Sequence, residues 1–122
     1  MPALRQQAVG LRNRDGNLVA VDVFAPSESY DLPAAVEVAA YRIVTEALTN
    51  VARHSSSPSA SVRLQRTAEG FYLEVTDQGS PNGAWRPGVG MASMRERATE
   101  LGGSLDAGPG PDGGRVTALL PL

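Results

Sequence analysis

The sequence predicts an α/β fold: a two-layer sandwich in which a mixed, mostly antiparallel sheet carries about three helices on one face. Three observations lead to this prediction. A helical apolar repeat runs from about residue 33 to Arg53. Alternating apolar and polar residues mark strand-like segments before and after that repeat. The resulting order of strands, helix, two strands, loop, helix and two strands is typical of one sheet covered by helices.

Composition limits the classes of function. The 122 residues and 42% apolar content suit a single domain with one packed core. Because 11 basic and 13 acidic residues give a net charge of -2 without a basic run, we expect no nucleic-acid partner and no direct membrane contact. The absence of cysteine excludes disulfide bonds and thiolate metal sites. No apolar run approaches the roughly 20 residues of a membrane span, so we expect a cytoplasmic location.

The first 17 residues are predicted to be a linker or the remnant of a hairpin, followed by one domain over residues 18–122. Val9–Asn13 and Leu18–Phe24 are strand-like and flank Arg14–Asn17, whose Asp-Gly pair is typical of a hairpin turn. Alternation within Leu18–Phe24 favours an edge or outer strand.

The central segment is predicted to be a long helix that begins around Asp31 to Pro33 and ends at about Arg53. Pro33 suits the first turn, where its missing N–H costs nothing, and Ser55–Pro58 stops the helix. One face is apolar, as expected for a helix that lies on a sheet. Its residues are Ala40, Ile43, Val44, Ala47, Leu48 and Val51.

The other face of this helix carries a row of polar side chains: Arg42, Glu46, Asn50 and then Arg53 or His54. A carboxylate and an amide one turn apart are hard oxygen ligands, and Mg²⁺ takes one or two such ligands beside substrate phosphates. A cation further along the row can contact those phosphates. The alternative is the solvated face of an ordinary amphipathic helix, which the helix taken alone favours.

The second half is predicted to contain a hairpin, a helix and two closing strands. Ala60–Arg66 and Phe71–Thr76 pair around a turn and present one apolar face to the helices. The apolar repeat of Met91–Leu101 indicates a helix that Gly102 ends. The closing strands are Ser104–Ala107 and Arg115–Leu120.

The segment Asp77–Gly90 is predicted to be a long loop, which in a compact domain is normally functional. Asp77 closes a strand, and Gly79 leaves room for a flat ligand, so the carboxylate can accept a hydrogen bond from an amine such as that of adenine. Gly88 and Gly90 precede a helix, where backbone N–H groups can bind phosphate. Each motif alone is also typical of an ordinary turn or flexible loop.

Taken in order, three motifs resemble those of a known family: EALTNVARH at Glu46–His54, DQG at Asp77–Gly79 and GVGMASMRER at Gly88–Arg97. They resemble the GHKL-type ATP-binding catalytic domain of sensor histidine kinases, which has the Bergerat-type fold. The similarity is closest to the subfamily paired with NarL-type response regulators, whose chains read YRIxxEALTNxxxH and GxGMxxMRER. The resemblance covers roughly residues 18–122.

The resemblance implies a role for each matching residue. Asn50 is implied to ligate Mg²⁺ that bridges the ATP phosphates, and Glu46 to hold the metal's water shell or polarise the reacting groups. Arg53 is implied to contact phosphate. Asp77 is implied to accept the hydrogen bond of the adenine amine, with Gly79 leaving room for the ring.

The same resemblance implies that Gly88 and Gly90 are hinges of a lid that closes over the phosphates, with Met91 beside the nucleotide. The implied enzyme is a protein histidine kinase that donates the γ-phosphoryl group of ATP. The acceptor histidine is expected on a helical dimerisation domain of the parent kinase, outside these residues. The further partner is a NarL-type response regulator, and the parent kinase can be membrane-anchored.

The chain departs from the family pattern at two places. Pro81 follows Ser80 where the family usually repeats a glycine, and Gly113-Gly114 stands where the family often has Gly-Thr. The hydroxyl that assists adenine binding is therefore expected to be missing, and Thr117 is expected to be unable to replace it because its place along the strand differs.

Other interpretations of individual residues and of the whole chain remain. His54 is interpreted as a helix cap or packing residue rather than the phospho-acceptor. Arg95–Arg97 is interpreted as a solvated helical face, against a role in docking or phosphate contact. The alternative functions are a degenerate, non-catalytic nucleotide-binding or interaction module and a serine kinase of the anti-sigma-factor type.

Overall fold

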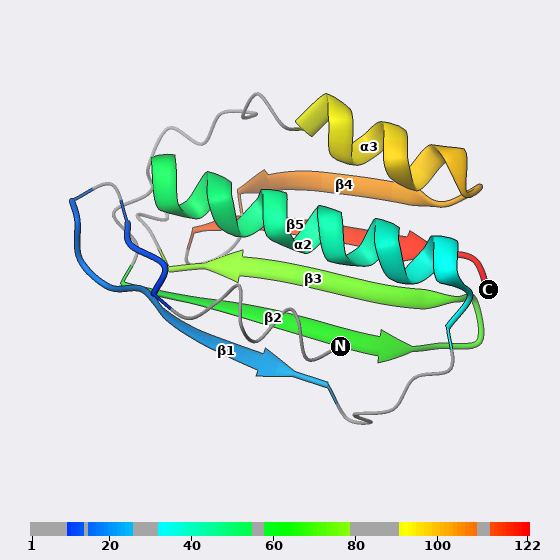
Figure 1. Cartoon of the computed structure of the whole chain (residues 1–122), viewed down its shortest axis with the longest axis horizontal. Helices are drawn as coiled ribbons and strands as arrows, with labels where there is room; N and C mark the ends of the chain where they lie inside the picture. The colour runs from blue at the N-terminus through cyan, green and yellow to red at the C-terminus, as the bar shows by residue number, and fades with distance from the viewer. Residues whose placement is uncertain (1–9, 14, 26–31, 55–57, 79–90, 110–112) are drawn as a thin grey trace.

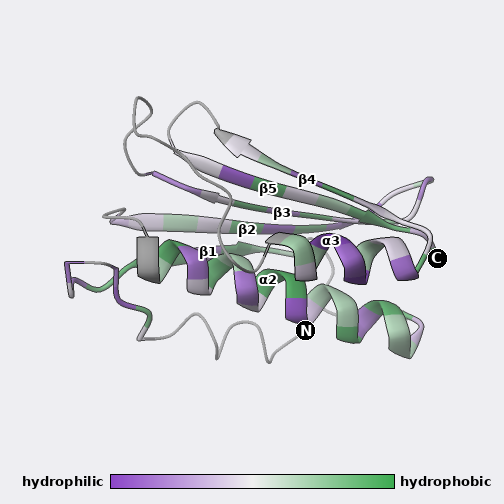
Figure 2. Cartoon of the chain, turned by 90° about the horizontal axis from the view of Figure 1, so that it is seen from above, coloured by the Kyte–Doolittle hydropathy of each residue, from purple (hydrophilic) through white to green (hydrophobic). Residues whose placement is uncertain are grey.

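A five-stranded sheet with two helices on one face forms the described part of the chain. The computed structural model describes residues 10–13, 15–25, 32–54, 58–78, 91–109 and 113–122. Its elements are β1 (Ala20–Phe24), α2 (Ala34–His54), β2 (Ser59–Arg66), β3 (Phe71–Asp77), α3 (Met91–Glu100), β4 (Ser104–Pro109) and β5 (Gly114–Leu120). The strand order is β1-β2-β3-β5-β4, and both helices lie on the same side (Figure 1, Figure 2).

The predicted fold class is confirmed, including the mostly antiparallel sheet. β1 runs parallel to β2, whereas the other three neighbouring pairs are antiparallel. The expected number of about three helices is wrong for the described residues, which contain α2 and α3. Neither glycine nor proline interrupts the 21 residues of α2, so this stretch forms one long helix.

The core lies between α2, α3 and one face of the sheet. The apolar stripe predicted for the long helix is buried, with Ile43 and Val44 at 0% exposure. Val62 and Leu64 of β2 and Met94 of α3 belong to the same buried cluster as this stripe. Each fully buried side chain of this size contributes about 1.5–3 kcal/mol through the area it removes from water.

Alternation along β3 decides which residues can reach a site under the helices. Phe71, Leu73 and Val75 are buried on the covered face. Because side chains alternate along a strand, Asp77 belongs to that same face, whereas Tyr72 and Glu74 belong to the uncovered face. β3 therefore carries the carboxylate of Asp77 on the covered face of the sheet and that of Glu74 on the uncovered face.

The ends of the long helix are as predicted within a residue or two. Pro33 lies immediately before α2 and not in its first turn, and its carbonyl accepts a hydrogen bond from the backbone N–H of Glu37 at 3.0 Å. α3 ends as the sequence indicated. Gly102 adopts a φ of 77° there, and the N–H of Gly103 donates to the carbonyl of Ala98 at 2.8 Å.

The N-terminal hairpin is shorter than the sequence indicated. Within the described residues it consists of an isolated bridge between Arg12 and Leu18. Asn13 holds the turn, since its Oδ1 accepts hydrogen bonds from the backbone N–H groups of Asp15 and Asn17 at 2.9 and 3.1 Å. β1 then forms the edge of the sheet, as expected. The predicted boundary at residues 17 and 18 stays a prediction.

Candidate functional site

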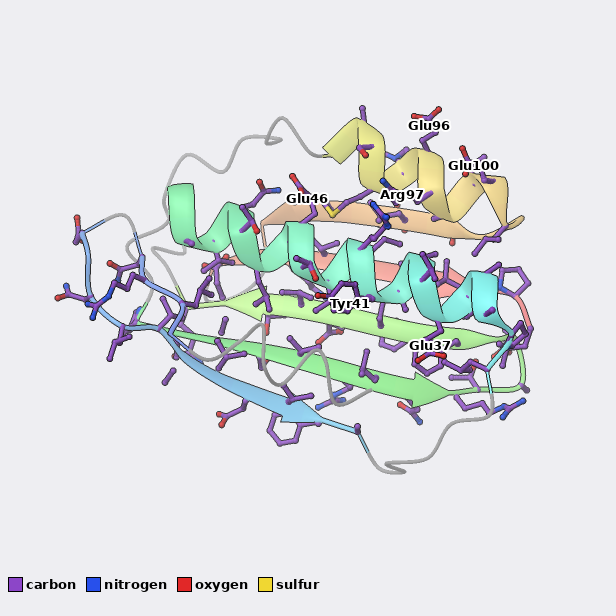
Figure 3. The ribbon with its side chains drawn as sticks, in the orientation of Figure 1. Glu37, Tyr41, Glu46, Glu96, Arg97 and Glu100 are labelled. Atoms are coloured by element: carbon purple, nitrogen blue, oxygen red, sulfur yellow. The ribbon has the colours of Figure 1, made fainter. Side chains whose placement is uncertain are left out.

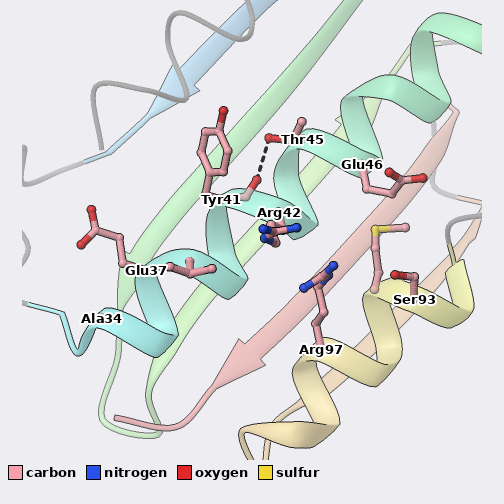
Figure 4. A pocket seen from close by; sticks show the side chains of 10 residues that line it. Ala34, Glu37, Tyr41, Arg42, Thr45, Glu46, Ser93 and Arg97 are labelled. Atoms are coloured by element: carbon pink, nitrogen blue, oxygen red, sulfur yellow. Dashed lines mark hydrogen bonds between the residues drawn. The ribbon is translucent and has the colours of Figure 1, made fainter.

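A cavity of about 910 Å³ lies between α2 and α3, above the covered face of the sheet (Figure 4). Two kinds of side chain line it. Apolar groups are joined by cationic, acidic and hydroxyl groups, a combination typical of binding sites. The lining residues are Ala34, Glu37, Val38, Tyr41, Arg42, Thr45, Glu46, Ser93, Met94 and Arg97.

Glu46 is the sequence-predicted site residue that lines this cavity. It is half-buried, and Figure 4 shows its side chain directed toward the Ser93 end of α3. Ala47 and Leu48 follow it and are buried against the sheet, so the helix phase keeps Glu46 on the side away from the core. Asn50 follows one turn later and is also half-buried.

These two side chains fit a magnesium ion of the kind that nucleotides carry. A carboxylate and an amide at positions four apart on one helix project in the same direction. Among the residues that the structure describes, no three His, Asp or Glu side chains gather as a self-sufficient metal site. A hard cation held by these two side chains would take its remaining ligands from phosphate and water oxygens, which is usual for Mg²⁺.

Asp77 stands at the end of β3, and it is half-buried. The neighbouring N–H of Gln78 donates to the carbonyl of Ser59 at 3.1 Å, which keeps the end of β3 paired with β2. Figure 1 shows the carboxyl ends of α2 and β3 at the same end of the molecule. The helix that carries Asn50 and the strand that carries Asp77 thus end together, as the sequence hypothesis requires.

The remaining predicted residues are only partly described. Gly79, Gly88 and Gly90 lie outside the described residues. Arg53 belongs to the last turn of α2, and Met91 is the first residue of α3, but their side chains lie outside what the structure describes. The cavity lining includes neither Asn50 nor Asp77.

Sequence reasoning missed half of the cavity. Val38 and Tyr41, with Glu37, extend it along the N-terminal half of α2. Arg97 was interpreted from the sequence as part of a solvated face. In the structure it lies on the side of α3 that is directed toward α2, whereas Glu96 and Glu100 lie on the opposite side of α3 (Figure 3). The sequence signal for this part of the cavity was Val38, an apolar residue on the polar side of the helix. In the structure the Val38 side chain is 53% exposed.

The uncovered face of the sheet carries a separate polar cluster. The hydroxyl of Tyr72 donates to Oε2 of Glu74 at 2.6 Å, and Nη2 of Arg115 donates to the same oxygen at 3.1 Å. Partial burial alone raises the pKa of Glu74, but the hydrogen bonds from Tyr72 and Arg115 and the nearby positive charges together lower that pKa below its ordinary value. Partial burial and the bond to Glu74 raise the pKa of Tyr72.

The register of β5 shows on which face of the sheet Thr117 and Gly114 lie. Thr117 pairs directly with Glu74 and therefore lies on the uncovered face. Gly114 begins β5 and belongs by alternation to the covered face, on the side of Asp77. The expectation that Thr117 is unable to replace a missing hydroxyl on that face is confirmed.

The fold agrees with the class of protein that the sequence motifs indicated. One helix over a mixed sheet presents a carboxylate and an amide, and a strand that ends beside it presents a second carboxylate. Neither helix in the described ranges has the length and apolar character needed to cross a membrane. The elements that carry these residues are those to which the sequence motifs of an ATP-binding domain were assigned.

Comparison with known families agrees with that class. The family of histidine kinase-, DNA gyrase B-, and HSP90-like ATPases matches residues 35–122. The chain belongs to this family.

Individual relatives are sensor kinases. The sensor histidine kinase YxjM of Bacillus subtilis is 34% identical over 123 residues, which cover 100% of this chain and 30% of YxjM. The sensor histidine kinase NarS of Mycobacterium tuberculosis is 34% identical over 128 residues, which cover 99% of this chain and 29% of NarS. This chain thus spans less than a third of these relatives.

A solved structure has the same fold. The blue-light activated histidine kinase of Erythrobacter litoralis EL346 superposes with a TM-score of 0.75, at 24% identity, over 99% of this chain and 41% of that protein.

Proposed function

We propose that this chain is the ATP-binding catalytic domain of a two-component sensor histidine kinase. The observation that carries the proposal is that Glu46 and Asn50 lie one turn apart on α2, whose carboxyl end is at the same end of the molecule as that of the strand that carries Asp77 (Figure 1). The proposed acceptor is a histidine on a helical dimerisation domain of the parent kinase, and the proposed downstream partner is a NarL-type response regulator. The names of YxjM and NarS support a kinase role.

The first group of proposed roles concerns binding of the adenine ring and of the phosphates. The carboxylate of Asp77 accepts a hydrogen bond from the adenine amine, and Gly79 leaves room for the ring. Arg53 contacts phosphate. Gly88 and Gly90, followed by Met91, form the hinge region that brings backbone N–H groups to the phosphates.

Asn50 and Glu46 are the proposed magnesium residues, Asn50 as a ligand and Glu46 through the water shell. When bound, Mg²⁺ neutralises charge on the phosphates. Glu46 in addition orients the acceptor imidazole and accepts its proton. In the overall transfer the bond between the γ-phosphorus and its bridging oxygen breaks, a phosphorus–nitrogen bond forms, and ADP leaves.

Two measurements test this proposal. Isothermal titration of the chain with a nonhydrolysable ATP analogue should show binding that strengthens with Mg²⁺. The full-length protein that contains this chain should then acquire acid-labile phosphate from ATP. Absence of binding at millimolar analogue would favour a non-catalytic interaction module, for which the lack of a hydroxyl at Gly114 is the specific structural argument. Acid-stable phosphate would instead favour a serine kinase.

A further inference from the structure

The cavity between α2 and α3 continues well beyond Glu46, away from the residues assigned to the nucleotide. Its outermost lining residues on α2 are Ala34 and Glu46, which are 12 positions apart. At a rise of 1.5 Å per residue this is about 18 Å of helix surface. An open groove of this length suits an elongated ligand, and a helix of about three turns would fill it.

The groove has an apolar part that is exposed to water. Val38 is 53% exposed, and Tyr41 beside it is half-buried. Met94, which is 1% exposed, lies at the floor between the two helices. The hydroxyl of Thr45 donates to the carbonyl of Tyr41 at 2.7 Å, so that hydroxyl is already engaged and the wall beside it is less polar than its sequence suggests.

Two arginines from different helices face this groove. Figure 4 shows the guanidinium groups of Arg42 and Arg97 in the space between α2 and α3. Throughout the described ranges the ion pair present is Arg115 with Glu74 on the far side of the sheet, and neither groove arginine has a hydrogen-bond or ion-pair partner. Guanidinium groups that face one groove from two helices can both bind a carboxylate placed between them.

We propose that this groove receives the helix that carries the phospho-acceptor histidine, and that Arg42 and Arg97 select that helix by pairing with its acidic side chains. The inference rests on the proposed function, because that function places the transferred phosphoryl group beside Glu46 at one end of the groove. A helix seated along the groove covers Val38 with an apolar side chain and presents the next turns to the arginines and Glu46. Its acidic residues lie opposite Arg42 and Arg97 and away from Glu37, which lines the far end.

The test reverses the charge of both groove arginines in the full-length protein. Arg42→Glu with Arg97→Glu should lower the rate constant of autophosphorylation at saturating ATP at least tenfold. The affinity for a nonhydrolysable ATP analogue should change less than threefold. The matched control is Arg66→Glu with Arg95→Glu, which makes the same change in net charge at two exposed arginines outside the groove. The control should change the transfer rate less than twofold.

Two further variants keep the result interpretable. Val38→Asp should lower the same rate constant without changing the thermal midpoint by more than a few degrees, because the side chain is exposed. Replacing acidic residues of the acceptor helix with lysine should restore transfer to the Arg42→Glu, Arg97→Glu protein. Equal rates in the groove and control variants would overturn the inference while leaving the proposed function intact. Failure of the unaltered protein to bind the ATP analogue would refute the proposed function itself.

Discussion

Glu46 and Glu74 are two half-buried glutamates on opposite sides of the sheet, and their surroundings differ. Oε2 of Glu74 accepts hydrogen bonds from Tyr72 and Arg115 within its own face of the sheet. Glu46, on α2, lines a cavity and has no hydrogen-bond or ion-pair partner in the described ranges. Residue type and burial are thus similar, but one carboxylate is paired by the fold and the other is not.

The difference indicates which acidic residue is available for chemistry. Leaving a polar group unpaired costs free energy when it is buried, and water offsets that cost at a half-exposed position. Glu46 can therefore stay hydrated until a ligand arrives, whereas Oε2 of Glu74 already accepts two hydrogen bonds from its neighbours. We expect function to depend on Glu46 and stability to depend slightly on Glu74.

The largest expected effect comes from Glu46→Gln. The neutral amide keeps the size of the side chain but removes the negative charge that orients and accepts a proton, so phosphoryl transfer by the full-length protein should fall by about 10²–10⁴-fold. The free energy of unfolding should change by less than about 0.5 kcal/mol. Glu74→Gln is the matched control and should retain transfer. Similar rates for the two variants would remove the functional distinction between them.

Asn50→Ala should have the next largest effect, confined to the magnesium-dependent part of binding. Loss of a metal ligand should weaken the Mg²⁺-dependent affinity for a nonhydrolysable ATP analogue by about 10- to 100-fold, with little change in metal-free affinity. Isothermal titration with and without Mg²⁺ measures both. Gln65→Ala removes an exposed amide from the uncovered face and serves as the control. Equal losses in the two conditions would make Asn50 a structural residue.

Asp77→Asn should reduce selectivity for adenine. The amide keeps an oxygen acceptor, but the hydrogen bond is no longer assisted by charge, so ATP affinity should fall about five- to tenfold while GTP affinity changes little. Competition binding with the two nucleotides gives the ratio. Asp106→Asn, at an exposed position of β4, is the control. An unchanged ratio would remove Asp77 from the base pocket.

The smallest effect should be the pH dependence that Glu74 gives to stability. Because the folded pKa of Glu74 lies below its unfolded value, its contribution is present above an unfolded pKa of about 4.3 and is lost as pH falls through the folded pKa. The contribution should be at most about 1 kcal/mol, as for other partly exposed ion pairs. Urea unfolding at pH 7 and near pH 3 should show Glu74→Gln less stable than the unaltered chain only at the higher pH. A difference that persists in acid would contradict this assignment.

Local pattern sufficed for the long helix, the central hairpin and the end of α3, but not for the number of helices or the extent of the N-terminal hairpin. The apolar stripe that includes Ile43 and Leu48, the hairpin around Thr67–Gly70 and the end of α3 at Gly102 all follow from period and turn chemistry. Gly70 shows how strict that chemistry is: its φ is 147°, and a Cβ there would clash with the carbonyl of Leu120. The sequence also placed Glu46 and Asn50 on one face of a helix, since residues four apart project together.

The tertiary structure alone decided which of these faces meet. β5 lies between β3 and β4, and β1 pairs in parallel with β2, arrangements that depend on contacts between distant segments. For the same reason, that Arg42 and Arg97 share one groove was not predictable from the sequence, since 55 positions separate them and their spacing has no periodic meaning. Periodicity determines which side of an element is buried, whereas packing of α2 against α3 determines which exposed side chains become neighbours.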